Sequence, residues 1–329
     1  MTLIPTDPGG ARIAEAVQAA RLYYFQDLTM AAIARELDVS RSTVSRLISY
    51  ARSSGLVEIR ITTPQGRAPQ VEQALCDAYG IRAHVVPVAE SVSDLDRLDK
   101  VALFAARLLG SFFDSDMVMG VAWGTTLSAV GRHLTPKRTH NAHVVQLNGA
   151  GNTRTTGISY ASDIVRGFAH AYGARPQEFP VPAFFDHPET RTHLWRERSI
   201  SRVLALQDRM DVAVFSIGAV GGQVPSHVYS AGYLENEDVV ALRADGVVGD
   251  IATVFFRGDG SWDGIALNER ASGPFLDRFR EVPRRLCIIS GEEKLAGLRG
   301  ALAGGLVTDL VIDDLSAAAL VAQQATAHR

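Results

Sequence analysis

The 329-residue sequence contains little cysteine and no long apolar segment. Its two cysteines, Cys76 and Cys287, lie far apart and outside any CxxC pair, so neither a disulfide framework nor a zinc knuckle is expected. No apolar run reaches the roughly 18 residues that a membrane-spanning helix needs, and the N-terminus lacks the basic and apolar pattern of a secretory signal. We therefore expect a cytoplasmic protein without metal, cofactor or membrane contact.

Lysine is also scarce, and many of the arginines that carry the positive charge gather near the N-terminus. Between Arg21 and Arg67 there are seven arginines and four acidic residues, which gives this segment a local charge of +3, whereas the whole chain carries −3. A basic segment on an acidic body is typical of a DNA-binding head attached to a domain with another task. The length also favours two domains.

Hydrophobic spacing and capping residues predict three short helices in the basic head, at 11–24, 30–37 and 41–54. Thr29 and Ser40 stand where N-cap hydroxyls belong, immediately before the second and third helices. Gly55 follows the third helix as a C-cap. Three helices of these lengths, joined by tight turns, form a helix-turn-helix DNA-binding unit.

The same spacing separates inward from outward side chains in the head. On the first helix, the predicted buried face consists of Ile13, Val17, Ala20 and Tyr24. Asp38 occupies a turn position of positive φ that glycine usually fills, and aspartate is among the residues that tolerate it. Val44 and Leu47 are expected to point inward from the third helix. This leaves the following residues to contact bases and phosphates: Ser40, Arg41, Ser42, Thr43, Ser45 and Arg46.

The head is expected to end in a wing and a linker. Residues 56–61 are rich in β-branched side chains and predict a strand. Residues 62–70 contain two prolines and a glycine, which is typical of a linker. The predicted organisation is thus a winged helix-turn-helix DNA-binding domain at 1–61, a linker at 62–70 and an effector and oligomerisation domain at 71–329.

In the larger domain, short apolar runs alternate with helical stretches. Buried strands are predicted at 85–88, 116–123, 143–147, 211–217 and 285–289. Helices are predicted at 70–79, 93–110, 125–134, 160–172, 190–208, 233–243, 292–303 and 314–324. This alternation predicts a doubly wound, mostly parallel α/β domain, in which ligands bind at the carboxyl ends of the strands.

Four glycine-containing loops are expected at that end of the sheet, at 120–126, 146–152, 246–251 and 290–294. In the first loop, Gly124 permits close backbone approach and Thr125 and Thr126 add hydroxyls at a helix start, which makes it a candidate phosphate cradle. It lacks the GxxxxGK[ST] lysine of a nucleotide triphosphate loop. The third loop would direct Asp250 toward sugar hydroxyls, and the fourth brings Lys294 to the start of a helix.

The order and spacing of these motifs resemble the SorC family, also called SorC/DeoR, of sugar-responsive bacterial regulators. The resemblance is carried by 29–47 and 55–61 in the head, and by 120–126, 146–149, 249–256, 291–294 and 304–307 in the body. It implies an effector domain similar to sugar-phosphate isomerases and coenzyme A transferases, with a phosphorylated sugar or related metabolite as ligand. It also implies a homodimer or homotetramer that binds operator DNA and represses a carbohydrate-utilisation operon.

The resemblance further implies a set of effector-binding residues: Gly124, Thr125, Thr126, Asn148, Gly149, Tyr160, Asp250 and Lys294. The first three would hold the phosphate with the lysine nearby, and the aspartate would bind hydroxyls. Asn148 and Gly149 belong to the second loop, which Tyr160 flanks.

Two other functions fit parts of the sequence. An isomerase-like or transferase-like enzyme with an appended head would use Asp250, Glu292 or Glu293 as acid and base, although no convergent carboxylate pair with a nucleophile is evident. A purely structural oligomerisation domain would leave the four polar loops unexplained. We therefore expect a DNA-binding regulator and not an enzyme.

Overall fold

The computed structural model describes residues 8–24, 28–57, 68–89, 91–152, 158–219, 227–230 and 232–327. The chain divides into two compact units, Met1–Gln65 and Gly66–Arg329. Among the described helices, none combines the length and the hydropathy that crossing a membrane requires.

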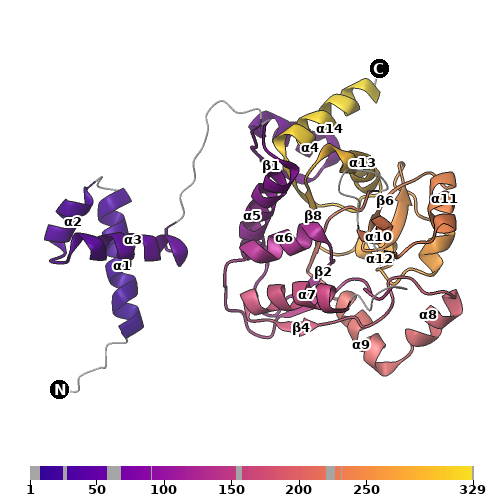
Figure 1. Ribbon diagram of the computed structural model, residues 1–329, viewed down its shortest axis with the longest axis horizontal. Coiled ribbons are helices and arrows are strands. Elements are labelled where there is room, and N and C mark those ends of the chain that lie inside the picture. Colours follow the sequence, from indigo (N-terminus) through magenta and orange to yellow (C-terminus); the bar gives the residue numbers. More distant parts are fainter. Residues whose placement is uncertain are drawn as a thin grey trace. The chain divides into compact units, whose positions relative to one another are not determined.

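The first unit contains the three predicted helices, α1 (Pro8–Tyr24), α2 (Met30–Glu36) and α3 (Arg41–Ser53), shown in Figure 1. Both predicted N-caps are confirmed: Thr29 Oγ1 accepts a hydrogen bond from the Ala32 amide at 3.3 Å, and Ser40 Oγ accepts one from the Thr43 amide at 3.1 Å. The turn before α3 also has the expected geometry, since Asp38 has a φ of 53°.

The buried face of α1 agrees with the prediction only in part. Ala20 is buried and Tyr24 packs against the core, as predicted, whereas Ile13 is 42% exposed and the unpredicted Ala16 and Ala19 are buried. Alanine spacing at i, i+3 and i+4 gives a flat face that lets a neighbouring helix approach closely, so a large side chain is not needed there. The rest of this core is as expected or extends it, with buried side chains at Ile33, Val44, Leu47, Ile48 and Ala51.

The predicted wing and linker fall largely outside the described residues, which leave out 58–67. Leu56 and Val57 belong to no strand. Helix α4 (Ala68–Tyr79) begins two residues before the predicted linker end at position 70.

The second unit is built on a seven-stranded parallel sheet with the order β1-β9-β8-β5-β2-β3-β4. Its strands are β1 (Arg82–Val86), β2 (Val118–Val121), β3 (His143–Gln146), β4 (Arg175–Gln177), β5 (Val212–Phe215), β8 (Arg284–Ile289) and β9 (Asp309–Asp313). Every residue of β2 and β5 is buried, as expected for central strands covered on both faces. The predicted doubly wound α/β domain is confirmed.

Helices cover both faces of this sheet (Figure 1). One face packs against α5 (Asp94–Phe112), α6 (Thr125–His133) and α7 (Ile158–Tyr172). The other packs against α4, α9 (Arg198–Gln207), α13 (Leu295–Ala303) and α14 (Asp314–Ala327). The shorter elements are α8 (Pro188–Leu194), α10 (His227–Ser230), α11 (Asn236–Ala244), α12 (Leu276–Phe279), η1 (Ala266–Glu269) and η2 (Glu292–Lys294).

Several features of this unit depart from the prediction, among them the short edge strand β4, which was not predicted. The single helix expected at 190–208 is divided into α8 and α9, and Trp195 in the break packs against the rings of Phe179 and Phe185 at 5.5 and 5.4 Å. Strand β9 was not predicted. Residues 246–251, expected as a strand-end loop of the main sheet, instead contain β6 (Val247–Ile251), which pairs with β7 (Val254–Arg257) in a separate antiparallel hairpin.

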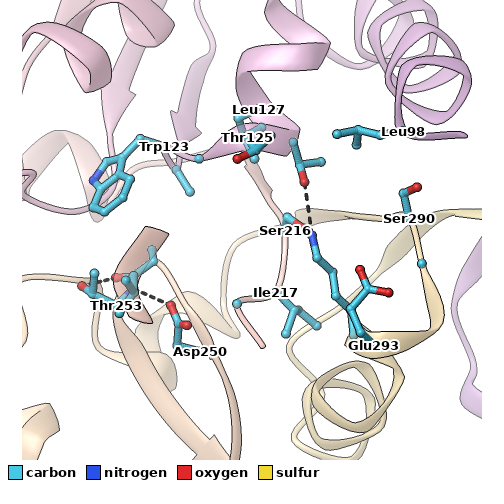
Figure 2. A pocket seen from close by; sticks show the side chains of 18 of the residues that line it. Leu98, Trp123, Thr125, Leu127, Ser216, Ile217, Asp250, Thr253, Ser290 and Glu293 are labelled. Atoms are coloured by element: carbon cyan, nitrogen blue, oxygen red, sulfur yellow. Dashed lines mark hydrogen bonds between the residues drawn. The ribbon is translucent and has the colours of Figure 1, made fainter. Parts of the chain in front are cut away.

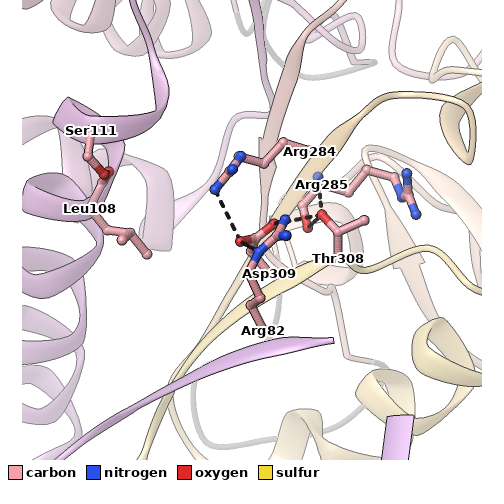
Figure 3. A network of polar contacts seen from close by, with 7 residues as sticks. All are labelled: Arg82, Leu108, Ser111, Arg284, Arg285, Thr308 and Asp309. Carbon is pink, nitrogen blue, oxygen red and sulfur yellow. Dashed lines mark hydrogen bonds and ion pairs between the residues drawn. The ribbon is translucent and has the colours of Figure 1, made fainter. Parts of the chain in front are cut away.

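A polar network ties together the amino-terminal ends of β1, β8 and β9 (Figure 3). The Asp309 carboxylate is fully buried and accepts hydrogen bonds from Arg82 at 2.7 and 2.9 Å, from Arg284 at 3.3 Å and from Thr308 at 2.7 Å. The Arg284 guanidinium also lies 3.7 Å from the ring centroid of Phe112, on α5. This end of the sheet is therefore closed by a fixed ion-pair cluster.

Candidate functional site

A cavity of about 120 Å³ opens at the opposite, carboxyl-terminal end of the sheet. Its lining comes from the segments after β8, β5, β2 and β3, which are adjacent in the sheet, together with the β6–β7 hairpin and the first turn of α5. At roughly 30 Å³ per molecule, the volume corresponds to about four water molecules, which is the scale of a small ligand. This is the end of a parallel sheet at which ligands bind.

The segment after β2 presents the start of α6 to the cavity. Gly124 precedes the helix with a φ of 147°, a conformation that residues with a side chain rarely adopt, and open space surrounds the position a Cβ would occupy. No side chain caps α6, so the amides of its first turn are available to a ligand. Free amides and the helix dipole favour an anion at this point.

Lys294 adds a positive charge at the same place. Its Nζ donates hydrogen bonds to Thr126 Oγ1 at 3.3 Å and to Ser216 Oγ at 3.2 Å, which joins the segments after β8, β2 and β5. Burial lowers the pKa of the Lys294 amine, while the carboxylates of Glu293 and Asp250 act in the opposite direction. The amine, two hydroxyls and the α6 amides are thus brought together, and such groups are the donors that phosphate-sized anions prefer.

Two acceptor groups lie on other walls of the cavity. Asn148 and Asp250 are 2% and 3% exposed, and the Oδ1 atom of each is buried without a well-formed hydrogen bond among the described residues, although the buried Tyr229 hydroxyl lies beside the Asp250 carboxylate and interacts with it. Asp250 Oδ2 accepts the Thr253 amide at 3.1 Å. In Figure 2, Thr125 and Leu127 lie above the cavity, whereas Asp250 and Thr253 lie below it. A ligand with hydroxyl donors away from its anionic group would satisfy these oxygens.

Burial raises the pKa of Asp250 to about 6, against the opposing effects of the Thr253 amide, the Lys294 charge and the Tyr229 hydroxyl. A carboxylate kept in such surroundings costs stability, so its retention in a cavity points to a binding role.

Main-chain contacts hold the hairpin that carries Asp250. Its amide and carbonyl pair with those of Gly218, after β5, at 3.2 and 3.0 Å. A Cβ on Gly249 would lie 2.8 Å from the Gly218 oxygen and 3.2 Å from the Cα of Gly297 in α13. Glycine at 249 therefore allows the hairpin to rest directly on the neighbouring backbone.

Trp123 fixes the segment after β3. Its Nε1 donates to the carbonyl oxygens of Gly149 at 2.9 Å and of Asn148 at 3.2 Å. The indole stacks on Tyr233 at 5.2 Å, and the Tyr233 hydroxyl donates to the Ala150 carbonyl at 3.0 Å. These contacts explain why the Asn148 side chain is held in the wall of the cavity.

Six of the eight predicted effector-binding residues line this cavity: Gly124, Thr125, Thr126, Asn148, Asp250 and Lys294. Gly149 does not line it, because a Cβ there would lie 2.3 Å from the carbonyl oxygens of both Val181 and Pro182, and the residue serves close backbone packing. Tyr160 also lies outside the lining, on α7, where its phenol hydrogen-bonds the side chains of Ser128 and Thr125.

Sequence reasoning missed several lining residues. Ser216 lay inside the predicted strand 211–217, although β5 ends at Phe215 and the serine is the first polar residue after it. That position was the signal that could have identified it. Asp94, Leu95 and Leu98 come from the start of α5, which follows the outermost strand and carried no ligand signature.

In the first unit, the predicted DNA-contacting residues lie on one side of α3 and at its N-cap. Arg41, Ser42, Ser45 and Arg46 are exposed. Ser40 Oγ is 2.8 Å from both Ser42 Oγ and Thr43 Oγ1, and Arg46 Nε donates to the Ser42 carbonyl at 3.3 Å. The arrangement leaves two guanidinium groups and the α3 N-terminus free to approach a nucleic-acid backbone.

Comparisons with known families agree with these two units. Residues 64–322 match the family described as "Putative sugar-binding domain", and residues 18–54 match sigma-70 region 4. The chain is similar to the deoxyribonucleoside regulator of Bacillus subtilis, with 32% identity over 93% of this chain and 96% of that protein. It is also similar to the sorbitol operon regulator of Klebsiella pneumoniae, with 28% identity over 90% of this chain and 93% of that protein.

Two solved structures extend the comparison. A domain of a possible sugar-binding transcriptional regulator from Arthrobacter aurescens TC1 has 56% identity and a TM-score of 0.75, and covers 79% of this chain and all of that one. The full-length sorbitol operon regulator SorC from Klebsiella pneumoniae has 26% identity and a TM-score of 0.71, over 94% of this chain and 99% of that one. These relatives are regulators of transcription rather than enzymes. The chain therefore belongs to the SorC/DeoR family of sugar-binding transcriptional regulators.

Proposed function

We propose that this protein is a cytoplasmic repressor of a carbohydrate-utilisation operon, released from operator DNA by a phosphorylated sugar. The observation that carries the proposal is the lining of the cavity. The Lys294 amine meets the uncapped start of α6 on one wall, and two buried oxygens without a well-formed hydrogen bond lie on other walls. That pairing suits a small molecule with a phosphate and several hydroxyls.

The relatives support the same class of ligand. Their names connect them with deoxyribonucleosides and with the sorbitol operon, both of which involve carbohydrates. On this proposal the phosphate contacts the α6 amides, Lys294 and Ser216, and the sugar hydroxyls contact Asn148 and Asp250.

The protein would bind operator DNA as a homodimer or homotetramer, since a two-fold operator matches a two-fold assembly. The outward residues of α3 would read bases and hold phosphates, with Arg41 and Arg46 providing charge. The effector would act by binding one arrangement of the oligomer more tightly than the other, and the coupling must be reciprocal between ligand and DNA.

The test uses the full chain and DNA fragments enriched from a random pool. A thermal-shift panel of sugar phosphates selects ligands, and fluorescence anisotropy then measures DNA affinity with and without each one. We expect at least one sugar phosphate to weaken DNA binding roughly tenfold. Unchanged DNA affinity across the whole panel would contradict the proposal.

Matched variants separate the two sites. Lys294→Met should abolish the response to ligand and leave DNA binding intact, whereas Lys100→Met, at an exposed lysine outside the cavity, should behave as wild type. Arg41→Ala should weaken DNA binding and reduce its salt dependence, whereas Arg198→Ala, at an exposed position on α9, should not.

A further inference from the structure

The charged side chains among the described lining residues are mostly negative. Lys294 is the one cationic side chain among them, and there are three carboxylates, on Asp94, Asp250 and Glu293, of which that of Asp94 is paired with Arg97 at 3.3 Å. A cavity suited to two phosphate groups needs a cation or a free helix start for each. Here the described part of the chain supplies one such position.

The position of that cation matters as much as its number. Two hydroxyls, those of Thr126 and Ser216, hold the Lys294 amine at the start of α6. The Asp250 carboxylate, in contrast, is carried by the β6–β7 hairpin, where the buried Tyr229 hydroxyl lies beside it and its Oδ1 atom lacks a well-formed hydrogen bond among the described residues. Positive charge is thus concentrated on the α6 wall, and an acceptor with negative charge occupies the hairpin wall.

We infer that the cavity selects a phosphomonoester whose remaining groups are neutral hydroxyls, and that Asp250 excludes ligands with a second anionic group. This inference rests on the proposed function and specifies the ligand class of the same site. The cavity would thus bind sugar monophosphates in preference to sugar bisphosphates and to phosphorylated sugar acids.

The physical reason is that a buried carboxylate attracts a hydrogen-bond donor and repels an anion. A ligand hydroxyl donates a charge-assisted hydrogen bond to Asp250. At pH 8 a second phosphate, whose pKa is about 6, or a carboxylate has almost no proton to donate and repels the Asp250 charge in surroundings that screen little. Asn148 Oδ1, which has no hydrogen-bond partner among the described residues, adds a second acceptor with the same preference.

The experiment is calorimetric titration of the full chain at pH 8 with matched ligand pairs. The pairs are fructose 6-phosphate with fructose 1,6-bisphosphate, and glucose 6-phosphate with 6-phosphogluconate. Within any pair that binds, we expect the monophosphate of the neutral sugar to bind at least about tenfold more tightly, which is about 1.4 kcal/mol. At pH 8 the carboxyl of Asp250 is ionised, because its pKa is about 6.

Asp250→Asn removes the charge and keeps the shape, so it should shrink the preference in each pair to less than about threefold. The control is Asp277→Asn, which changes the net charge equally at an exposed position on α12, outside the cavity. This control should keep the wild-type preference.

The outcomes are distinct. Equal or tighter binding of the bisphosphate or the sugar acid by the wild-type protein would overturn the inference and leave the proposed function standing. That comparison needs no variant, so it holds even if Asp250→Asn does not fold. A preference that survives in a folded Asp250→Asn protein would also overturn the inference. If none of the sugar phosphates in the thermal-shift panel binds, the proposed function itself is overturned.

Discussion

Replacing Asp250 by asparagine is expected to stabilise the ligand-free protein at pH 8. The carboxyl has a pKa raised from 3.8 to about 6 because it is buried. The folded state therefore holds the proton more tightly than the unfolded state, and ionising the group lowers stability. This difference corresponds to about 3 kcal/mol above pH 7, which asparagine would recover.

The direction of the pKa shift predicts a pH dependence that would identify ionisation of Asp250 as the cause of the destabilisation. Since the folded pKa is the higher one, the destabilisation is complete above about pH 7, declines as the pH falls through 6 and vanishes below the unfolded value of 3.8. Roughly half of the advantage of Asp250→Asn should therefore disappear by pH 5. The amide nitrogen that Asp250→Asn introduces would lack an acceptor, which would subtract about 1–2 kcal/mol from the stabilisation. This loss is the same at both pH values, so the pH dependence of the stabilisation is unchanged.

The assay is thermal unfolding of wild type and Asp250→Asn at pH 8 and pH 5. For a domain of this size about 1 kcal/mol shifts Tm by roughly 2–4 °C, so the advantage of the variant should fall by roughly 3–6 °C between the two conditions. Asp277→Asn, at an exposed position, is the control. The reasoning is refuted if the change in Tm caused by Asp250→Asn is the same at both pH values.

Three further predictions follow from backbone geometry and the ion-pair cluster. Gly124→Ala should weaken sugar-phosphate binding at least about tenfold, because alanine rarely adopts a φ of 147°, and calorimetry with an undiminished affinity would contradict this. Asp309→Ala should lower the free energy of unfolding by about 3 kcal/mol, since it removes the one buried acceptor that Arg82, Arg284 and Thr308 share, whereas Arg82→Ala, at a side chain 59% exposed, should lower it less. Denaturant titration measures the free energy of unfolding of both variants, and a larger loss for Arg82→Ala than for Asp309→Ala would contradict the prediction. Asp38→Gly should slightly raise the Tm at which the first unit unfolds, because the φ of 53° at this position suits glycine. A clear drop in this Tm by calorimetry would contradict the prediction.

Local chemistry explains which parts of the fold the sequence could predict. The caps at Thr29 and Ser40 and the turn at Asp38 depend on neighbouring residues only, and all three have the predicted geometry. Central strands such as β5 were recognisable because burial on both faces requires a continuous apolar run.

Features that depend on distant residues were not predictable in the same way. Strand β9 has three apolar residues between Asp309 and Asp313, and the first of these acids is buried only because Arg82 and Arg284 reach it from other strands. The face of α1 was predicted only in part: Ile13 was chosen over Ala16 and Ala19 because large residues were weighted above alanines, although close helix packing favours alanine.

The candidate site was predicted in part for the right reason. Lys294 and the residues 124–126 follow parallel strands, as expected. Asp250 also lines the cavity, but on a separate hairpin that no local pattern distinguishes from a strand-end loop. Its position depends on long-range contacts to Gly218 and Gly297.

The seating of that hairpin on bare backbone has a consequence for ligand size. Lys294 immediately precedes α13, and Gly297, one turn later, touches the strand that carries Asp250 through Gly249. Rotamer changes cannot absorb a displacement where main chain rests on main chain, so the polypeptide itself fixes the distance between the backbones that carry Lys294 and Asp250. Within the reach of these two side chains, the proposed function would therefore make the spacing between phosphate and hydroxyls a selected property of the ligand.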